Sequence, residues 1–168
     1  RDSVFSFDKD DLRRDMTCVP YKYDKNLNQE YDMGIAGMGA AKWSKLYMQA
    51  PLGATSGSNT GINNVRMRFA DVLLMYAEAV WRAHEVPSPE ALEYVNQVRR
   101  RGFGKDINTP DAGVDLETGD KSYLLEAIKD ERPRELGFEL LRKDDIVRWG
   151  EFYDRMRYAR SLAAAIPD

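Results

Sequence analysis

The chain has 168 residues, of which 43% are hydrophobic and 32% charged, a balance typical of a folded domain rather than a disordered chain. Its formal net charge of −3 argues against nucleic acid or an anionic membrane as a partner, because both attract basic surfaces. No apolar run approaches the roughly 18 residues that span a bilayer, and the start at Arg1 indicates a mature product or a fragment of a longer protein.

Residues 1–65 have no sustained helical period and are predicted to be mainly loop. The segments "GIAGMGAA" and "GATSGSNTGINN" are rich in Gly and Asn, which tolerate positive φ angles. Between them, "KWSKLYM" (42–48) has the near-alternation of a short strand, and "DKDDLRRD" (8–15) fits a helical turn or a loop with capping aspartates. Isolated aromatic residues are spread through the region: Tyr21, Tyr23, Tyr31, Trp43 and Tyr47.

A helical period begins at Arg66. Residues 66–83 place apolar side chains at helical spacing, and "SPEALEYVNQVRRRG" (88–102) predicts a second helix. Ser88 suits the N-cap, Pro89 the first helical position and Gly102 the C′ position. The two helices predict an antiparallel pair of about 35 residues, the size of one tetratricopeptide-like unit.

The rest of the chain predicts a long loop (102–120) and two further helices, Ser122–Leu141 and Asp145–Ala165. Four acidic loop residues leave a calcium site open as an alternative, although their spacing differs from an EF-hand and solvated acids are the commoner reading. They are Asp111, Asp115, Glu117 and Asp120. We therefore divide one domain into a loop-rich, aromatic-bearing segment with a short strand (1–65) and a helical region (66–168).

The third predicted helix carries charged residues on its core-facing side. Five of them fall on the same side as Ile128: Glu131, Arg132, Glu135, Glu139 and Arg142. Isolated buried charges cost several kcal/mol, so such residues are expected in ion pairs.

Arg142, Asp145 and Arg148 are the local partners that the spacing offers, and removing Arg142 is predicted to leave Glu135 and Glu139 unpaired. A second supply lies on the first helix, where Arg68, Asp71 and Glu78 share one stripe. If the two helices pack together, the charged stripes meet.

Clustered carboxylates are also found as catalytic acid–base pairs and di-metal sites. Interleaved arginines keep carboxylates ionised, however, and a di-iron bundle requires Glu-x-x-His motifs that the single His84 cannot supply. His84 and the single Cys18 likewise disfavour nucleophilic triads and His/Cys metal centres, and Cys18 alone forms no internal disulfide. We interpret the charges as a structural network, with no catalytic residue, cofactor or metal.

Three motifs resemble the C-terminal half of the RagB/SusD family. They are "RFADVLLMYAEA" (68–79), "VNQVRRRG" (95–102) and "AIKDERPRELGFELLRKDDIVRWG" (127–150), and "DLRRDMT" (11–17) resembles a weaker D-x-R-x-x-x-T element. The matching residues are Arg68, Ala70, Asp71, Leu73, Leu74, Ala77, Glu78, Ala79, Asn96, Val98, Arg99, Arg101, Glu131, Arg132, Glu135, Leu136, Phe138, Glu139, Arg142, Asp145, Arg148, Trp149 and Gly150.

Departures from the family pattern are Leu140 in place of Gly and Ile146 in place of Leu, together with Pro133 inside the third helix. We expect Pro133 to kink that helix or to restart it. The family's usual C-terminal run and its N-terminal half, with the lipidated cysteine and most tetratricopeptide-like helices, do not appear in this sequence.

The resemblance implies a mainly α, SusD-like tetratricopeptide-like scaffold with long loops and a short strand region. It implies non-catalytic binding of oligosaccharides or other nutrients on the outer-membrane surface of Bacteroidetes, delivery to a TonB-dependent transporter, and a membrane link only through a lipid anchor absent from this chain. The alternatives are a tetratricopeptide-like protein-interaction scaffold without a sugar site and, less favoured, a hydrolase.

Sugar contact is expected from loop aromatics, because sugar rings stack on aromatic faces. The candidates are Trp43 and Tyr31, then Tyr21 and Tyr23. For Trp43 a core position against the first helix is the competing reading. The aromatics at helical spacing are expected in the core: Tyr76, Trp81, Tyr94 and Trp149.

Overall fold

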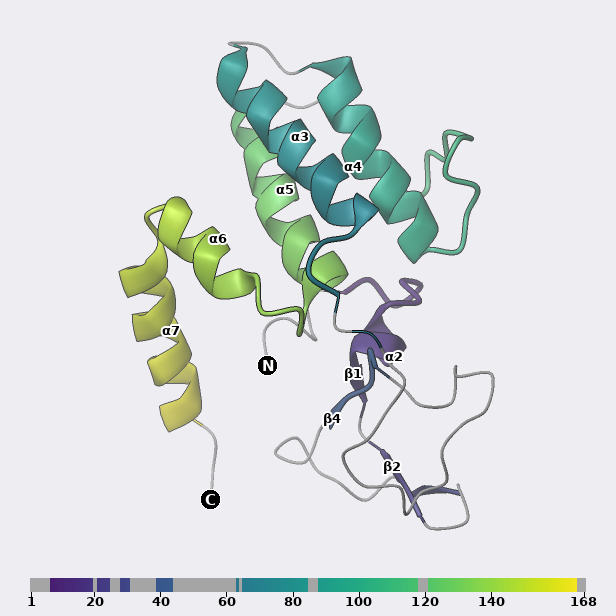
Figure 1. Cartoon of the computed structure of the whole chain (residues 1–168), viewed down its shortest axis with the longest axis vertical. Coiled ribbons are helices and arrows are strands. Elements are labelled where there is room, and N and C mark those ends of the chain that lie inside the picture. Colours follow the sequence, from purple (N-terminus) through teal and green to yellow (C-terminus); the bar gives the residue numbers. More distant parts are fainter. Residues whose placement is uncertain are drawn as a thin grey trace.

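The computed structural model describes residues 7–19, 21–24, 28–30, 39–43, 63, 65–84, 88–117 and 121–165 (Figure 1). The mainly helical fold expected from the sequence is confirmed. Helices α3 (Phe69–Ala83), α4 (Pro89–Gly102) and α5 (Lys121–Leu136) pack against one another, with α3 and α4 side by side. Among the described residues, no helix combines the length and hydropathy needed to cross a bilayer.

The core lies where these three helices meet. Each helix supplies apolar residues three or four positions apart, so they share one face. The buried members are Leu74, Ala77, Ala91, Val95, Val98, Leu124, Ile128 and Leu136. Burying one large aliphatic side chain contributes about 1.5–3 kcal/mol, so this small core holds the three helices together.

Helix α4 begins as predicted, with Ser88 at the N-cap and Pro89 in the first turn. The prediction that Gly102 occupies the C′ position after the helix is wrong. Gly102 is the last helical residue, and the left-handed backbone occurs at Gly104, with φ 68°.

Helix α5 ends at Leu136 rather than at the predicted Leu141. The backbone turns left-handed at Phe138 (φ 64°) and Leu140 (φ 66°), so a right-handed helix cannot continue through them. Gly137 precedes this turn, and a Cβ there would lie 2.8 Å from the Pro133 carbonyl oxygen. The chain therefore needs a glycine at position 137 to leave the helix so sharply.

The last predicted helix is in fact two helices, α6 (Arg142–Arg148) and α7 (Phe152–Ala164). The break falls at Gly150, whose φ of 77° belongs to the left-handed region. Figure 1 shows α6 and α7 beside the three-helix core, with α7 at its edge. None of the α7 residues is buried.

Pro133 lies inside α5, so the helix does not restart there. Proline has no N–H, which leaves the Lys129 carbonyl without its usual helical donor. The Arg142 guanidinium lies over this carbonyl, with its Nη1 3.5 Å from the oxygen. A side chain from the next helix thus partly replaces the missing backbone bond.

The described residues of the N-terminal part include a short helix, α2 (Arg14–Thr17), and two small antiparallel ladders. Strand β1 (Cys18–Val19) pairs with β4 (Gly39–Ala40), with Cys18 opposite Ala40. Strand β2 (Lys22–Tyr23) pairs with β3 (Gln29–Glu30). The strand predicted at 42–48 is wrong at its start, because Lys42 and Trp43 form a turn, and residues 44–48 lie outside the described residues.

Replacing Leu140 by glycine is expected to stabilise the fold by about 0.5–1 kcal/mol. The left-handed conformation costs an ordinary residue about 1–2 kcal/mol, of which the greater freedom of glycine in the unfolded chain offsets about 0.4–1. Leu140 is 90% exposed, so the change removes no buried surface. Leu140→Ala, which keeps the Cβ, should stay within about 0.5 kcal/mol of the unchanged chain in urea unfolding. Equal effects of the two changes would contradict this account.

Candidate functional site

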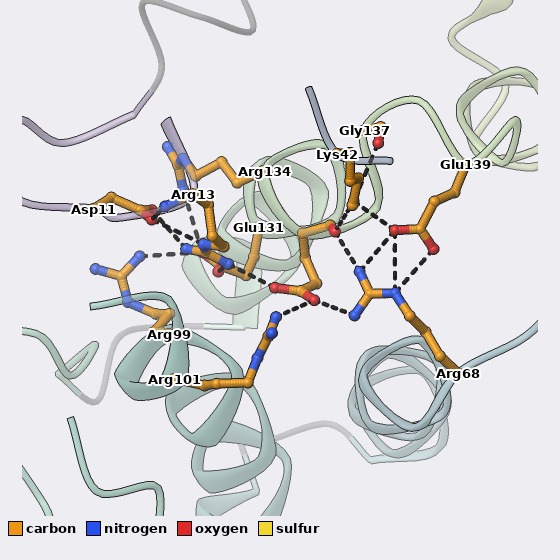
Figure 2. Close-up of polar contacts among 11 residues, drawn as sticks. Asp11, Arg13, Lys42, Arg68, Arg99, Arg101, Glu131, Arg134, Gly137 and Glu139 are labelled. Atoms are coloured by element: carbon orange, nitrogen blue, oxygen red, sulfur yellow. Dashed lines mark hydrogen bonds and ion pairs between the residues drawn. The ribbon is translucent and has the colours of Figure 1, made fainter. Parts of the chain in front are cut away.

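The charged side of α5 forms two groups of ion pairs. The first, here called the α5 cluster, joins α5 to the N-terminal segment, the Lys42 turn, the residue before α3 and the end of α4 (Figure 2). Its carboxylates are Asp11, Glu131, Glu135 and Glu139, and its cations are Arg13, Lys42, Arg68, Arg99, Arg101 and Arg134.

Arg13 is the centre of one half of the α5 cluster. Its Nη1 lies 2.6 Å from Glu131 Oε1 and 3.0 Å from Glu135 Oε2, while Nε and Nη2 hold both oxygens of Asp11. Burial opposes the charge on Arg13, but these carboxylates outweigh it and raise the pKa of the guanidinium. Gly102 makes room for this group, since a Cβ there would lie 2.7 Å from Arg13 Nη2 and closer to Nε.

The other half of the α5 cluster surrounds Glu139. Arg68 Nε donates to both Glu139 oxygens at 2.9 and 3.1 Å, and Lys42 Nζ lies 2.5 Å from Oε1. Burial tends to raise the pKa of Glu139, but hydrogen bonds from Arg68 and Lys42 hold it below its ordinary value. Arg68 also pairs with Glu135, and Lys42 donates to the Glu135 and Gly137 carbonyls, at 2.5 and 3.1 Å. The turn that ends α5 is therefore capped by a lysine from the N-terminal segment.

The second group, here called the Arg132 group, lies between α3, α5 and α6. Arg132 donates from Nη1 to Asp71 Oδ1 at 2.9 Å and from Nε to Asp145 Oδ2 at 2.7 Å, and all three side chains are buried. Arg148 bonds both Asp145 and Glu78, the latter at 2.5 Å. The stripe expected on the first helix thus meets the charged face of the third.

Arg142 does not pair with Glu135 or Glu139, so the partners expected from sequence spacing are wrong. Those glutamates bond cations from other segments, and among the described residues Arg142 forms no ion pair. Its guanidinium instead covers the Lys129 carbonyl and stands 5.6 Å from the centre of the Trp149 ring. Burial and the nearby charge of Arg155 lower the pKa of Arg142.

Several members of the α5 cluster were not foreseen as partners, namely Asp11, Arg13, Lys42, Arg99 and Arg101. The first two belong to "DLRRDMT" and the last two to "VNQVRRRG", so the motifs contained a signal. Lys42 had none, because nothing in "KWSKLYM" indicates contact with a helix end more than 90 residues away.

The arrangement favours folding over acid–base chemistry. Each carboxylate of the α5 cluster faces at least one guanidinium, so these carboxylates are already engaged in ion pairs within the fold. In the acidic loop, Asp115 is held by Arg100 through bonds of 2.5 and 2.7 Å, and Asp111 accepts the Gly113 N–H. Across the described ranges, no three His, Cys, Asp or Glu side chains are grouped to hold a metal ion.

The four aromatic ligand candidates differ in exposure and in location. Trp43 lies in the turn after β4 and is 37% exposed, Tyr21 is half-buried, and Tyr23 belongs to β2. Tyr31 lies outside the described residues. Among the helical aromatics, Tyr76 is exposed, so its predicted core position is wrong. Its ring contacts that of Tyr94 edge to face, with the ring centres 5.1 Å apart. Trp81 packs against the core, and Trp149 donates from its indole to Glu78 at 3.1 Å.

Surface pockets border these groups. A pocket of about 440 Å³ lies between α5, α6 and α7, and its charged lining residues are Asp130, Arg132, Arg142, Asp145 and Arg155. A second pocket of about 260 Å³ lies beside the α5 cluster and includes Lys42 and Arg101.

Fold and site together define a helical scaffold whose helices are joined by buried ion pairs. The model of the SusD family matches residues 9–164, and the chain belongs to this family. The resemblance of the three motifs is thereby confirmed.

Known relatives extend well beyond the length of this chain. SusD-like protein P25 of Formosa agariphila is 31% identical over 155 residues, which cover 92% of this chain and 26% of that protein. SusD-like protein P2 of the same organism is 36% identical over 107 residues, 62% of this chain and 20% of that protein. The chain therefore corresponds to about a quarter of these relatives.

Solved structures share the fold. A SusD homolog from Bacteroides thetaiotaomicron VPI-5482 superposes with a TM-score of 0.69 at 30% identity, covering 86% of this chain and 31% of that one. A SusD superfamily protein from Parabacteroides distasonis ATCC 8503 gives a TM-score of 0.61 at 25% identity, covering 83% and 28%.

Proposed function

We propose that the protein to which this chain belongs binds glycans or other nutrients at the cell surface and passes them to a TonB-dependent outer-membrane transporter. Membership of the SusD family over residues 9–164 is the observation that carries this proposal. The outer membrane is its proposed location, reached through a lipid anchor of the longer protein.

Binding without catalysis is supported by the state of the acidic residues. The buried glutamates are engaged by arginines, and burial of Glu78, although it tends to raise its pKa, is outweighed by hydrogen bonds from Arg148, Trp149 and Arg82. A glycosidase needs one carboxyl with a raised pKa beside an open cleft. Chromatography of an oligosaccharide incubated with the protein should therefore return it uncleaved.

Replacing Trp43 by alanine is expected to weaken oligosaccharide binding about tenfold or more while leaving the fold intact. An indole offers a broad face to the C–H side of a sugar ring, and Trp43 is the candidate with an exposed ring that the structure describes. A glycan array identifies a binding oligosaccharide, and calorimetric titration then compares the two chains.

Tyr153→Ala is the matched control, because it removes an exposed aromatic ring from α7 without touching the Trp43 turn. It should leave the affinity unchanged. Unaltered affinity of a well-folded Trp43→Ala chain would remove Trp43 from the site, and loss of folding would favour its competing role as a core residue.

A protein-interaction scaffold without a sugar site is the second candidate, and an apolar stripe on α3 favours it. Phe69, Val72, Met75 and Tyr76 are exposed along one side of this helix, at a spacing that suits a partner helix. Failure of every oligosaccharide to bind, together with loss of a defined protein partner in Phe69→Ser, would favour this candidate over the first.

A further inference from the structure

Most of the charged side chains that line the pocket beside the α5 cluster are cationic. It has a volume of about 260 Å³, and five cationic side chains line it together with one carboxylate, Glu135. The cations are Arg13, Lys42, Arg68, Arg101 and Arg134. They come from the N-terminal segment, the Lys42 turn, the start of α3 and the ends of α4 and α5, so the pocket exists only where these segments meet.

The charges of the whole cluster do not balance. Six cations face four carboxylates, a difference of two positive charges among the residues of the α5 cluster. Figure 2 shows cationic side chains from several segments pointing toward these carboxylates. Among the described residues, the cations of this cluster therefore outnumber its carboxylates.

Exposure sharpens this imbalance at the surface. The carboxylates are at most 3% exposed, whereas the side chains of Lys42, Arg68 and Arg101 are 20%, 25% and 53% exposed. A molecule approaching from solvent meets ammonium and guanidinium groups and almost no carboxylate oxygen.

The ammonium group of Lys42 is incompletely compensated by nearby carboxylates. Burial lowers the pKa of its ammonium group, and the attraction of Glu139 does not fully restore it, partly because Arg68 lies close by. An additional anion in the pocket would favour the charged form of Lys42.

We propose that this pocket binds the anionic group of an acidic oligosaccharide, a uronate carboxylate or a sulfate ester, held by Arg101 and Lys42. The inference rests on the proposed function, and it specifies the class of glycan. Guanidinium groups bind carboxylate and sulfate-like oxygens through paired hydrogen bonds, which a neutral sugar cannot match in charge.

Size and position fit one charged sugar residue rather than a whole oligosaccharide. Pockets for complete small ligands usually have roughly 300–1,000 Å³, somewhat more than this one. Trp43 follows Lys42 directly in the chain, and its exposed ring offers a neighbouring residue of the same oligosaccharide a face to stack on. The two contacts together would engage an acidic sugar residue and its neighbour in the same oligosaccharide.

The test is a glycan array that pairs neutral oligosaccharides with uronate-containing and sulfated ones of equal length. Calorimetric titration of the best acidic binder, its neutral counterpart and sodium sulfate then gives affinities. The acidic oligosaccharide should bind at least tenfold more tightly than the neutral one, and its affinity should fall as salt rises while that of the neutral one does not.

Arg101→Gln should lose at least fivefold in affinity for the acidic oligosaccharide, whereas Arg101→Lys should keep most of it. Arg82→Gln is the matched control. Arg82 is 54% exposed and pairs with a buried glutamate as Arg101 does, but it lies outside the pocket. Circular dichroism verifies that each variant is folded, and if Arg101→Gln is not, the salt dependence of the unchanged chain decides.

Three results would overturn the inference. Equal affinity for acidic and neutral partners would reject the acidic specificity and leave the proposed function standing. Sodium sulfate binding as tightly as the oligosaccharide would reduce the pocket to a site for free anions. Absence of binding to any oligosaccharide would contradict the proposed function as well.

Discussion

Replacing Arg132 by methionine is expected to lower the free energy of unfolding by about 3–5 kcal/mol. Arg132 bridges Asp71 on α3 and Asp145 on α6, and all three side chains are buried. Methionine fills similar space but leaves two carboxylates inside the protein without their shared cation. Breaking a buried ion pair from one side has this cost because the remaining charge is uncompensated. Urea unfolding of the two chains measures the difference.

Arg82→Met is the control for this change, since Arg82 is largely exposed and pairs with Glu78 within one helix. Its loss should cost less than about 1 kcal/mol, as is usual for surface ion pairs. If Arg132→Met also lowered the free energy of unfolding by less than about 1 kcal/mol, water would have to reach Asp71 and Asp145. That result would contradict a buried Arg132 group.

Arg13→Met should lower the free energy of unfolding by a comparable amount, about 3–5 kcal/mol. Its local effect should be concentrated in the N-terminal segment. Arg13 connects Asp11 in the N-terminal segment to Glu131 and Glu135 on α5, across more than 100 residues of chain. Without it, three carboxylates lose a cation and the N-terminal segment loses a main anchor. Backbone amides of residues 13–17 should exchange hydrogen faster than those of α4.

The adjacent Arg14 provides the control, because in the described part of the chain its ion-pair partner is the neighbouring Asp15 at the surface. Arg14→Met should change neither the unfolding transition nor the exchange pattern. Uniform acceleration of exchange in Arg13→Met, extending equally to α4, would mean that Arg13 stabilises the whole fold without anchoring its own segment.

The helices could be predicted because their determinants are local. Leu74 and Ala77, and Leu124 and Ile128, repeat at helical spacing, and Ser88 with Pro89 marks a helix start. The ends of the helices were harder to predict from the sequence. Phe138 and Leu140 adopt the left-handed backbone that is usually assigned to glycine. Their residue types therefore did not predict the end of α5.

The ion pairs could be predicted as a set but not as individual partners. Core-facing charges on α5 require counterions, and the stripe on α3 offered suitable ones. Which guanidinium meets which carboxylate depends on tertiary packing, so Arg142 was assigned to Glu135 and Glu139 while Arg13 and Lys42 were missed. Sequence spacing reports neighbours on one helix, and most of these partners come from other segments.

We infer that the Arg132 group holds the fold together, whereas the proposed ligand contacts, Trp43, Lys42 and Arg101, lie outside that group. Calorimetric titration of the Arg132→Met chain with the bound oligosaccharide, at a temperature well below its unfolding transition, tests this claim most directly. We expect a dissociation constant within twofold of that of the unchanged chain, despite the loss of stability. A dissociation constant at least tenfold weaker, in a chain that circular dichroism shows to be folded, would place the ligand at the Arg132 group and contradict this inference.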